Sequence, residues 1–361
     1  MSDAAPIESD PPGIRRAEVT AWCEANIARC HGPLRFELVA GGRSNLTYRV
    51  DDATGMSFVL RRPPLGHLLP SAHDMAREFR IISALGSTVV PVAPALGICF
   101  DEAVTDHPFY VMGFVPGHIL RNPDDAQALP VAARAKAGES IIDVLADLHA
   151  LDVDAVGLGE LGKREGYIAR QLKRWHTQFT QSKLREVPMV DQVFAILSGQ
   201  IPEQQGVSIV HGDYRLDNTM VDMNGNIVAV LDWEICTLGD PLADLGLLMV
   251  YWPEPTDPNP PLGAAATTAP GFASRHQLVE RYRTRSNRDL SAIDFYVAFG
   301  YWKLACILDG VYTRYASGAM GNDGYDFSIL DAQVNNLAQT AASLLDSAPN
   351  DMTQPKQGAK K

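Results

Sequence analysis

The chain has 361 residues, which is long enough for two domains with separate hydrophobic cores. Hydrophobic residues make up 46% of the sequence and charged residues 20%, as in ordinary globular proteins, so a fibrous or largely disordered chain is excluded. The net charge of -12 argues against nonspecific binding to nucleic acid. The five cysteines are scattered and form no Cys-x-x-Cys pair, so the sequence predicts neither a disulfide framework nor a zinc site.

The two ends of the chain are polar. Residues 1–13 contain acids and prolines in place of a basic and then apolar segment, so we expect no secretory signal. No apolar run approaches the roughly 18 residues that span a bilayer. We therefore expect a cytoplasmic protein without a membrane partner, and a disordered tail at residues 347–361.

The first third of the chain reads as a β-rich domain with few helices. A glycine turn, Gly41-Gly42-Arg43-Ser44-Asn45, is predicted to close a hairpin between the first two strands. The segment Val115-Pro116-Gly117 ends the last strand and marks a domain boundary. The predicted helices are residues 14–28 and 71–85, and the predicted strands are residues 34–40, 45–50, 58–61, 95–101 and 109–114.

From residue 126 onward the pattern is mainly helical. Residues 141–151 carry a buried apolar stripe, and residues 157–205 are amphipathic, with Arg170, Lys173 and Arg174 on one helical face. Asp240-Pro241 has the residue types that begin a helix. A loop rich in proline and alanine, residues 251–271, is a candidate substrate lid. Further helices are predicted at residues 276–284, 294–312 and 331–345.

One predicted hairpin gathers oxygen-bearing side chains. Asn224-Gly225 has the residue types of a two-residue type I′ turn. Such a turn places Asn218 opposite Leu231 and one step from Asp232. Asp213 lies five residues before Asn218 and enters the same end of the hairpin, so the three polar side chains are expected to converge.

This set of residue types suits a magnesium ion and a phosphate. Mg²⁺ takes one or two carboxylate or amide ligands from a protein and the rest from water and substrate phosphates, which fits Asp232 and Asn218. Asp213 would then accept the proton of an attacking hydroxyl. The alternative is that these residues form turns and end a strand. We favour the functional interpretation because the motif and the hairpin geometry agree independently.

The segments from His211 to Asn218 and from Val230 to Glu234 resemble the catalytic loop and metal motif of the aminoglycoside phosphotransferase and choline kinase superfamily. The segments 170–175 and 237–241 resemble, more closely, the kinase-like domain fused to some acyl-CoA dehydrogenases. The likeness runs from about residue 35 to about residue 345. It implies an α+β, bilobal protein-kinase-like fold with a small β-rich N-lobe and a larger helical C-lobe.

The resemblance also implies a domain plan. Residues 1–33 would form an N-terminal extension and helix, and residues 34–114 an N-lobe that binds the phosphates and adenine of ATP. Residues 115–346 would form a C-lobe with the catalytic loop, the metal site and the acceptor site, followed by the tail at residues 347–361.

Site residues follow from the same resemblance. Asp213 would be the catalytic base, with Asn218 and Asp232 as the Mg²⁺ ligands, and His211 would brace the catalytic loop. Glu78 would pair with a phosphate-binding cation on the third strand, where Arg61 replaces the usual lysine; arginine keeps the charge but differs in geometry. Ser44 and Asn45 would lie over the ATP phosphates, and the backbone from Met112 to Phe114 would bind adenine.

The sequence therefore predicts an ATP-dependent kinase that phosphorylates a small-molecule hydroxyl. The alternative is a catalytically weak, nucleotide-binding pseudokinase that acts through partners, which Arg61 keeps open. A protein kinase is disfavoured because Asp240 follows Asp232 too closely for a long activation segment. The oligomeric state is left open.

The charge of the C-lobe points to the kind of acceptor. Two groups of cations, within residues 160–186 and 276–288, favour an anionic or neutral acceptor over a polycationic aminoglycoside. Each group could also be a solvated helix face. The association with acyl-CoA dehydrogenases makes a hydroxyacyl compound the first candidate.

Overall fold

The computed structural model describes residues 10–40, 45–66, 73–257, 260–320 and 324–346. The chain divides into two compact units, Met1–Pro116 and Gly117–Lys361. Ser44 and the predicted tail at residues 347–361 lie outside the described residues.

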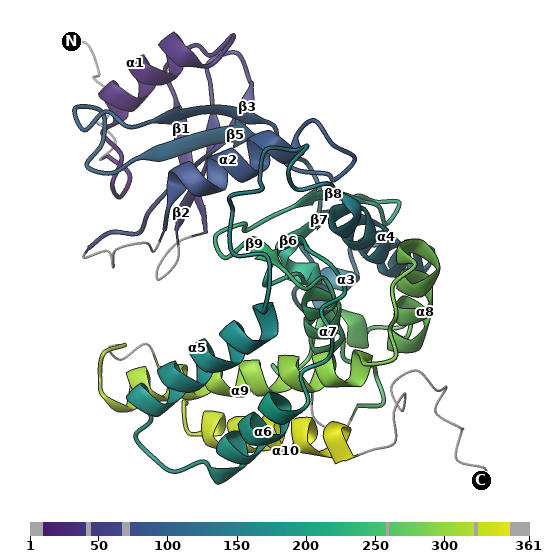
Figure 1. Ribbon diagram of the computed structural model, residues 1–361. Helices are drawn as coiled ribbons and strands as arrows, with labels where there is room; N and C mark the ends of the chain where they lie inside the picture. Colours follow the sequence, from purple (N-terminus) through teal and green to yellow (C-terminus); the bar gives the residue numbers. More distant parts are fainter. Residues whose placement is uncertain (1–9, 41–44, 67–72, 258–259, 321–323, 347–361) are drawn as a thin grey trace, which may run out of the picture. The chain divides into compact units, whose positions relative to one another are not determined.

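The first unit is built on an antiparallel sheet of five strands in the order β1-β2-β3-β5-β4 (Figure 1). Two helices accompany it, α1 (Arg16–Asn26) and α2 (Met75–Leu85). The strands are β1 (Arg35–Ala40), β2 (Leu46–Asp51), β3 (Ser57–Arg62), β4 (Ala95–Cys99) and β5 (Phe109–Gly113). All seven elements were predicted, with bounds that shift by a few residues.

The two helices cover opposite faces of this sheet. Side chains alternate along each strand, so successive residues of one strand contact different helices. Val19 and Cys23 of α1 share a core with Leu60 of β3 and Val111 of β5. Tyr110, the next residue on β5, points to the other face, where its hydroxyl donates to Glu78 of α2 over 3.0 Å. Neighbouring residues of one strand therefore serve different helices.

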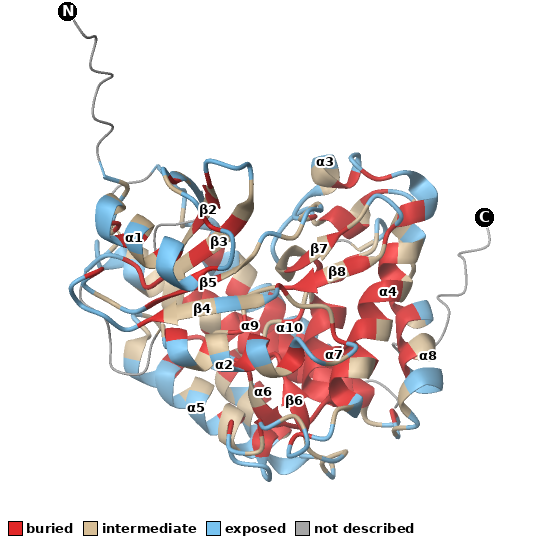
Figure 2. Cartoon of the chain, turned by 90° about the horizontal axis from the view of Figure 1, so that it is seen from above, coloured by how far each residue is buried: buried red, intermediate tan, exposed pale blue. Residues whose placement is uncertain are grey.

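The second unit is mainly helical. Its centre is formed by α7, in which every residue is buried, and by the long helix α9 (Figure 2). The helices are α3 (Pro123–Ala126), α4 (Val131–Ala150), α5 (Tyr167–Ser182), α6 (Pro188–Gly199), α7 (Leu242–Val250), α8 (Arg275–Ser286), α9 (Ile293–Ala316) and α10 (Ile329–Asp346). In the described part of the chain, no helix is long and apolar enough to cross a bilayer.

Two small antiparallel sheets complete the second unit. β6 (Ser208–Val210) pairs with β9 (Thr237–Gly239), and β7 (Thr219–Val221) pairs with β8 (Ile227–Val230). The first pair was not predicted, because three-residue strands leave almost no periodic pattern. A 3₁₀ turn, η1 (Leu216–Asn218), leads into β7, and a second, η2 (Ala266–Thr268), lies within the predicted loop.

The turn between β7 and β8 differs from the prediction. Asp222 N–H donates to Asn226 O and Gly225 N–H to Asp222 O, so three residues form the connection instead of two. Only Gly225 of these has a positive φ, at 85°, whereas a type I′ turn needs a positive φ at Asn224 as well. The register at the open end is nevertheless the predicted one, because the extra residue is absorbed by a bulge next to the turn.

Candidate functional site

The catalytic loop begins directly after β6, and its first residue, His211, is fully buried. His211 Nε2 lies 2.8 Å from the carbonyl oxygen of Leu231 and therefore donates to it, while Nδ1 accepts from the Asp213 N–H at 3.3 Å. One imidazole thus links the loop to the end of β8. The predicted role of His211 as a brace is confirmed by these contacts.

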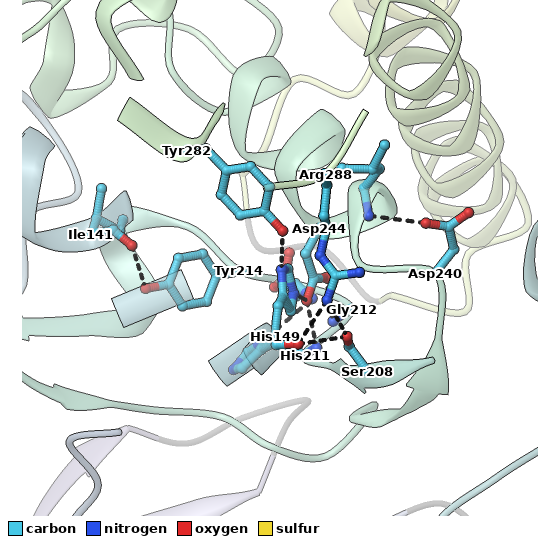
Figure 3. Close-up of polar contacts among 12 residues, drawn as sticks. Ile141, His149, Ser208, His211, Gly212, Tyr214, Asp240, Asp244, Tyr282 and Arg288 are labelled. Carbon is cyan, nitrogen blue, oxygen red and sulfur yellow. Dashed lines mark hydrogen bonds and ion pairs between the residues drawn. The ribbon is translucent and has the colours of Figure 1, made fainter. Parts of the chain in front are cut away.

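The carboxylate of Asp244 holds the same loop from the other side. It accepts the backbone N–H of His211 at 2.7 Å and that of Gly212 at 2.8 Å. His149 Nε2 lies 3.4 Å from the same carboxylate, and His149 Nδ1 lies 2.8 Å from the Tyr282 hydroxyl (Figure 3). His149 and Asp244 are therefore structural, and they fix the backbone that leads into Asp213.

Asp213 itself is partly exposed and is joined to Asn218. The Asn218 Nδ2 donates to Asp213 Oδ2 and to the Asp213 carbonyl, each over 2.9 Å. These two bonds turn the amide nitrogen toward Asp213 and leave Oδ1 of Asn218 available as a ligand. The donor set of Asn218 Oδ1 and the Asp232 carboxylate fits a hard cation such as Mg²⁺.

The hairpin brings Asp232 to the position that the register predicted. Leu231 N–H donates to Asn218 O over 2.9 Å, so Asp232 is the first residue beyond the pair. Asp232 has a left-handed backbone with φ at 61°, an uncommon conformation for a residue with a side chain. Within the described ranges no group of three or more His, Cys, Asp and Glu could hold a metal. A Mg²⁺ site formed by Asn218 and Asp232 has only two protein ligands, because substrate phosphates and water supply the others.

In the first unit an ion pair joins the third strand to α2. Arg61 Nε lies 2.9 Å from Glu78 Oε2, and Glu78 is 1% exposed. The hydroxyl of Tyr110 donates to Oε2 and the amide of Asn45 to Oε1 of the same carboxylate. Arg61, which stands where the family usually has lysine, therefore pairs with the Glu78 carboxylate of α2.

The neighbouring Arg62 faces the opposite side of the sheet. It is fully buried, donates to the carbonyl oxygens of Gly13 and Pro63, and pairs with Asp106 over 3.0 Å. The two adjacent arginines thus have different partners, and the one that contacts Glu78 is Arg61, as the resemblance implied. Arg62 is structural, and Arg61 is the cation on the face of α2.

The other residues predicted to bind nucleotide lie in three places. Ser44 is outside the described residues. Asn45 is buried, and its amide contacts Glu78 and His73, so its side chain supports the ion pair. Met112 belongs to β5 and Phe114 follows that strand, where its ring lies under the Arg49 guanidinium at 4.8 Å.

A pocket lies next to the predicted catalytic loop, and much of its lining comes from the segment 251–271 that was predicted as a substrate lid. Its cavity volume is about 70 Å³, it opens to solvent, and its charged lining residues are Arg121, Arg215 and Asp217. Arg215 lies 3.5 Å from Asp213 Oδ2 and 3.2 Å from Asp217, with its guanidinium 4.8 Å from the centre of the Tyr251 ring. Arg215 was not predicted as a site residue, and its proximity to Asp213 in sequence was the available signal. The rest of the lining is apolar or backbone, from residues 120, 216, 250, 253 and 261–267.

Most cations of the two basic groups, within residues 160–186 and 276–288, form ion pairs or hydrogen bonds inside the second unit. Arg281 and Arg285 pair with Asp143 and Asp147 of α4, each over 2.7 Å. The group at residues 276–288 therefore gives no support to an anionic acceptor. In the group at residues 160–186, Arg164, Lys183 and Arg185 also pair with carboxylates, whereas Lys173 and Arg174 are exposed on α5.

The sequence from residue 35 to residue 278 matches the model of the phosphotransferase enzyme family known as APH. This match covers more than half of the chain and includes the catalytic loop, the hairpin and the Arg61–Glu78 pair. The chain belongs to this family. The phosphotransferase is 35% identical over 293 residues to acyl-CoA dehydrogenase family member 10 of Mus musculus, a match that covers 80% of the chain but 27% of the mouse protein.

Solved structures agree with this assignment. A candidate aminoglycoside phosphotransferase from Ralstonia eutropha JMP134 superposes with a TM-score of 0.77 and 30% identity, covering 92% of this phosphotransferase and 98% of the other chain. Choline kinase from Cryptosporidium parvum Iowa II superposes with a TM-score of 0.63 at 11% identity, covering 91% and 96%, which shows the fold alone. The phosphotransferase thus has the expected α+β protein-kinase-like fold.

Proposed function

We propose that this phosphotransferase is an ATP-dependent kinase that transfers the γ-phosphate to a hydroxyl group of a small metabolite. The observation that carries the proposal is the arrangement of Asp213 and Asn218. The amide of Asn218 donates to Asp213 and presents its oxygen to a cation, so one short segment holds both a base and a metal ligand.

The chemistry follows from these positions. Asp213 would accept the proton of the acceptor hydroxyl as its oxygen forms a bond to the γ-phosphorus, while the bond from that phosphorus to the bridging oxygen breaks and ADP leaves. Mg²⁺, held by Asn218 and Asp232 together with the phosphates, would neutralise the charge of the transferred group. Arg61, fixed by Glu78, would bind nucleotide phosphates in the first unit.

The pocket beside the catalytic loop supports an anionic or neutral acceptor. Arg121 supplies positive charge at this cavity, while Arg215, which pairs with Asp213 and Asp217, places guanidinium N–H donors next to the proposed base. A hydroxyacyl compound has a chain for the apolar wall and a polar head for the guanidinium groups. The similarity to acyl-CoA dehydrogenase family proteins leads to the same candidate.

The pseudokinase alternative rested on Arg61. Because Arg61 pairs with the buried Glu78, the usual partnership of cation and helix carboxylate survives the replacement of lysine. This pairing favours the enzyme.

Turnover of Mg-ATP by the purified protein, with hydroxy acids, hydroxyacyl-CoA esters, choline and aminoglycosides as acceptors, tests the proposal. We expect a phosphorylated product with at least one hydroxy acid or hydroxyacyl ester, and no product from Asp213→Asn. The exposed Asp289→Asn variant is the matched control. Binding of Mg-ATP without turnover on any acceptor would replace the kinase with the pseudokinase.

A further inference from the structure

Lys303 is a buried lysine in the middle of α9. Its side chain is 7% exposed in a helix that packs against α5 and α7. The ammonium group donates to the carbonyl oxygen of Gly212 over 2.9 Å and lies 5.7 Å from the centre of the Trp175 ring of α5. Gly212 is the residue before Asp213, so this lysine contacts the catalytic loop next to the proposed base.

Burial of this charge works against stability. Desolvation lowers the pKa of Lys303, opposed by attraction to Asp213 and Asp244, while Arg174 lowers it further. An ammonium has three N–H donors, and Gly212 O is the hydrogen-bond acceptor that the described residues offer it. Methionine has a similar length and would avoid the desolvation, so stability alone does not explain a lysine at this position.

The contacts of Gly212 explain what the lysine does. Its N–H is held by Asp244 over 2.8 Å, and its C=O is held by Lys303 over 2.9 Å. These groups belong to the two peptide units that flank the Cα of Gly212, whose φ of 86° is open mainly to glycine. Fixing the second peptide unit also fixes the direction in which the Cβ of Asp213 leaves the backbone.

We propose that Lys303 is a positioning residue for phosphoryl transfer, which holds the Gly212 carbonyl and thereby orients Asp213 toward the acceptor hydroxyl. The proposal rests on the proposed kinase function. General-base catalysis requires the carboxylate within hydrogen-bond reach of the proton that it accepts, and a misplacement of about 1 Å costs up to about 100-fold in rate. A rotation of one peptide unit is enough to move a carboxylate by this amount.

Three variants separate positioning from stability. Lys303→Met removes both the charge and the donor, whereas Lys303→Gln keeps an N–H donor without the charge. Arg185→Met is the matched control, because Arg185 pairs with Asp309 of the same helix over 2.6 Å and makes no contact with the catalytic loop in the described structure. All three are compared as full-length protein for kcat, KM for Mg-ATP, thermal midpoint and backbone amide exchange.

We expect Lys303→Met to lower kcat by about 10- to 100-fold with KM for Mg-ATP within about twofold of wild type. Lys303→Gln should regain part of the lost kcat. Amide exchange in residues 211–218 should rise in Lys303→Met and stay at the wild-type level in Arg185→Met. We expect Arg185→Met to have a lower thermal midpoint than Lys303→Met, because it leaves the buried Asp309 without its ion pair.

The proposal is overturned if Lys303→Met keeps kcat within about threefold of wild type, or if Lys303→Gln is no more active than Lys303→Met. Should the methionine variant not fold, Lys303→Leu, which also lacks the N–H donor, takes its place, and unchanged kcat and exchange in that variant would reject the proposal. The exchange measurement needs no acceptor. Absence of turnover in wild type would therefore reject the kinase function, while unchanged exchange in an active enzyme would reject only the role of Lys303.

Discussion

The side-chain amide of Asn218 and the carboxylate of Asp213 are joined at 2.9 Å, and the same nitrogen also reaches the Asp213 carbonyl. One residue thus orients the proposed base with its nitrogen and offers its oxygen to a cation. Asn218 in turn is fixed by the pairing of its carbonyl with Leu231 at the end of the hairpin. The proposed base and the proposed metal ligands therefore depend on the same backbone.

The substitution Asp213→Asn should remove phosphoryl transfer while Mg-ATP still binds, because the base is lost and the metal ligands remain. We expect kcat to fall by about 100-fold or more. Steady-state kinetics and calorimetric titration of Mg-ATP would check both parts. Turnover close to wild type would show that another group accepts the proton.

The substitution Asp232→Ala should weaken binding of Mg-ATP more than Asp217→Ala does. Asp232 follows the Asn218–Leu231 pair, whereas Asp217 pairs with Arg215 and lines the neighbouring pocket. Titration of Mg-ATP into the two variants measures the difference. Equal affinities would contradict the assignment of Asp232 as a ligand.

The substitution Arg61→Met should lower kcat/KM for Mg-ATP by about 10- to 100-fold, since a hydrogen bond to a charged group contributes about 1.5–3 kcal/mol. Arg61→Lys should keep more activity because the charge next to Glu78 remains. The exposed Arg35→Met variant on β1 is the control. If Arg61→Met bound and used Mg-ATP like wild type, another cation would have to bind the phosphates.

Acceptors with a carboxylate, a phosphate or no charge should be phosphorylated in preference to aminoglycosides. We expect Arg121→Ala to raise KM for an anionic acceptor by about 3- to 10-fold without changing KM for Mg-ATP, because Arg121 lines the pocket and is exposed. Acceptor screening followed by kinetics on the best substrate would measure both effects. Efficient phosphorylation of aminoglycosides alone would contradict the expected acceptor class.

Folding should become less stable as the pH falls through the titration of His149. Burial lowers the pKa of His149 below the usual 6.5, despite the attraction of Asp244 and Asp240, and Arg288 lowers it further. Below pH 6.5 the unfolded chain takes up a proton that the folded state excludes, so the stability present above that pH is lost by up to about 1.4 kcal/mol per pH unit.

Denaturant unfolding at several pH values would measure this effect. The slope between pH 7.5 and about pH 5.5 should be smaller in His149→Gln than in wild type. The Tyr282 hydroxyl, which faces the other ring nitrogen, stays uncharged over this range because burial raises its pKa. An unchanged slope in His149→Gln would contradict the lowered pKa.

Local patterns were sufficient to predict the elements of the first unit and the longer helices of the second, but not the short strands β6 and β9. The alternation in β2 and β3 is a short-range property, so the bounds of these strands could be predicted to within a few residues. The apolar stripe at residues 141–151 predicted only the second half of α4, which begins at Val131. The register at the open end of β7 and β8 was also predicted correctly, and with it the position of Asp232 directly after the Asn218–Leu231 pair. The turn was predicted wrongly, because Asn224-Gly225 suits both a two-residue and a three-residue connection.

The sequence by itself determined the residue types of the site: an Asp, an Asn and a second Asp, at spacings that a loop and a hairpin bring together. It did not determine that Arg62 turns to the other face of the sheet and is buried there, or that the ammonium of Lys303 holds the peptide before Asp213. The contacts of the two arginines depend on which helix covers which face of the sheet. The contact of Lys303 depends on which side of α9 is buried. Such contacts join residues that are far apart in sequence, and only the packing of the folded chain decides them.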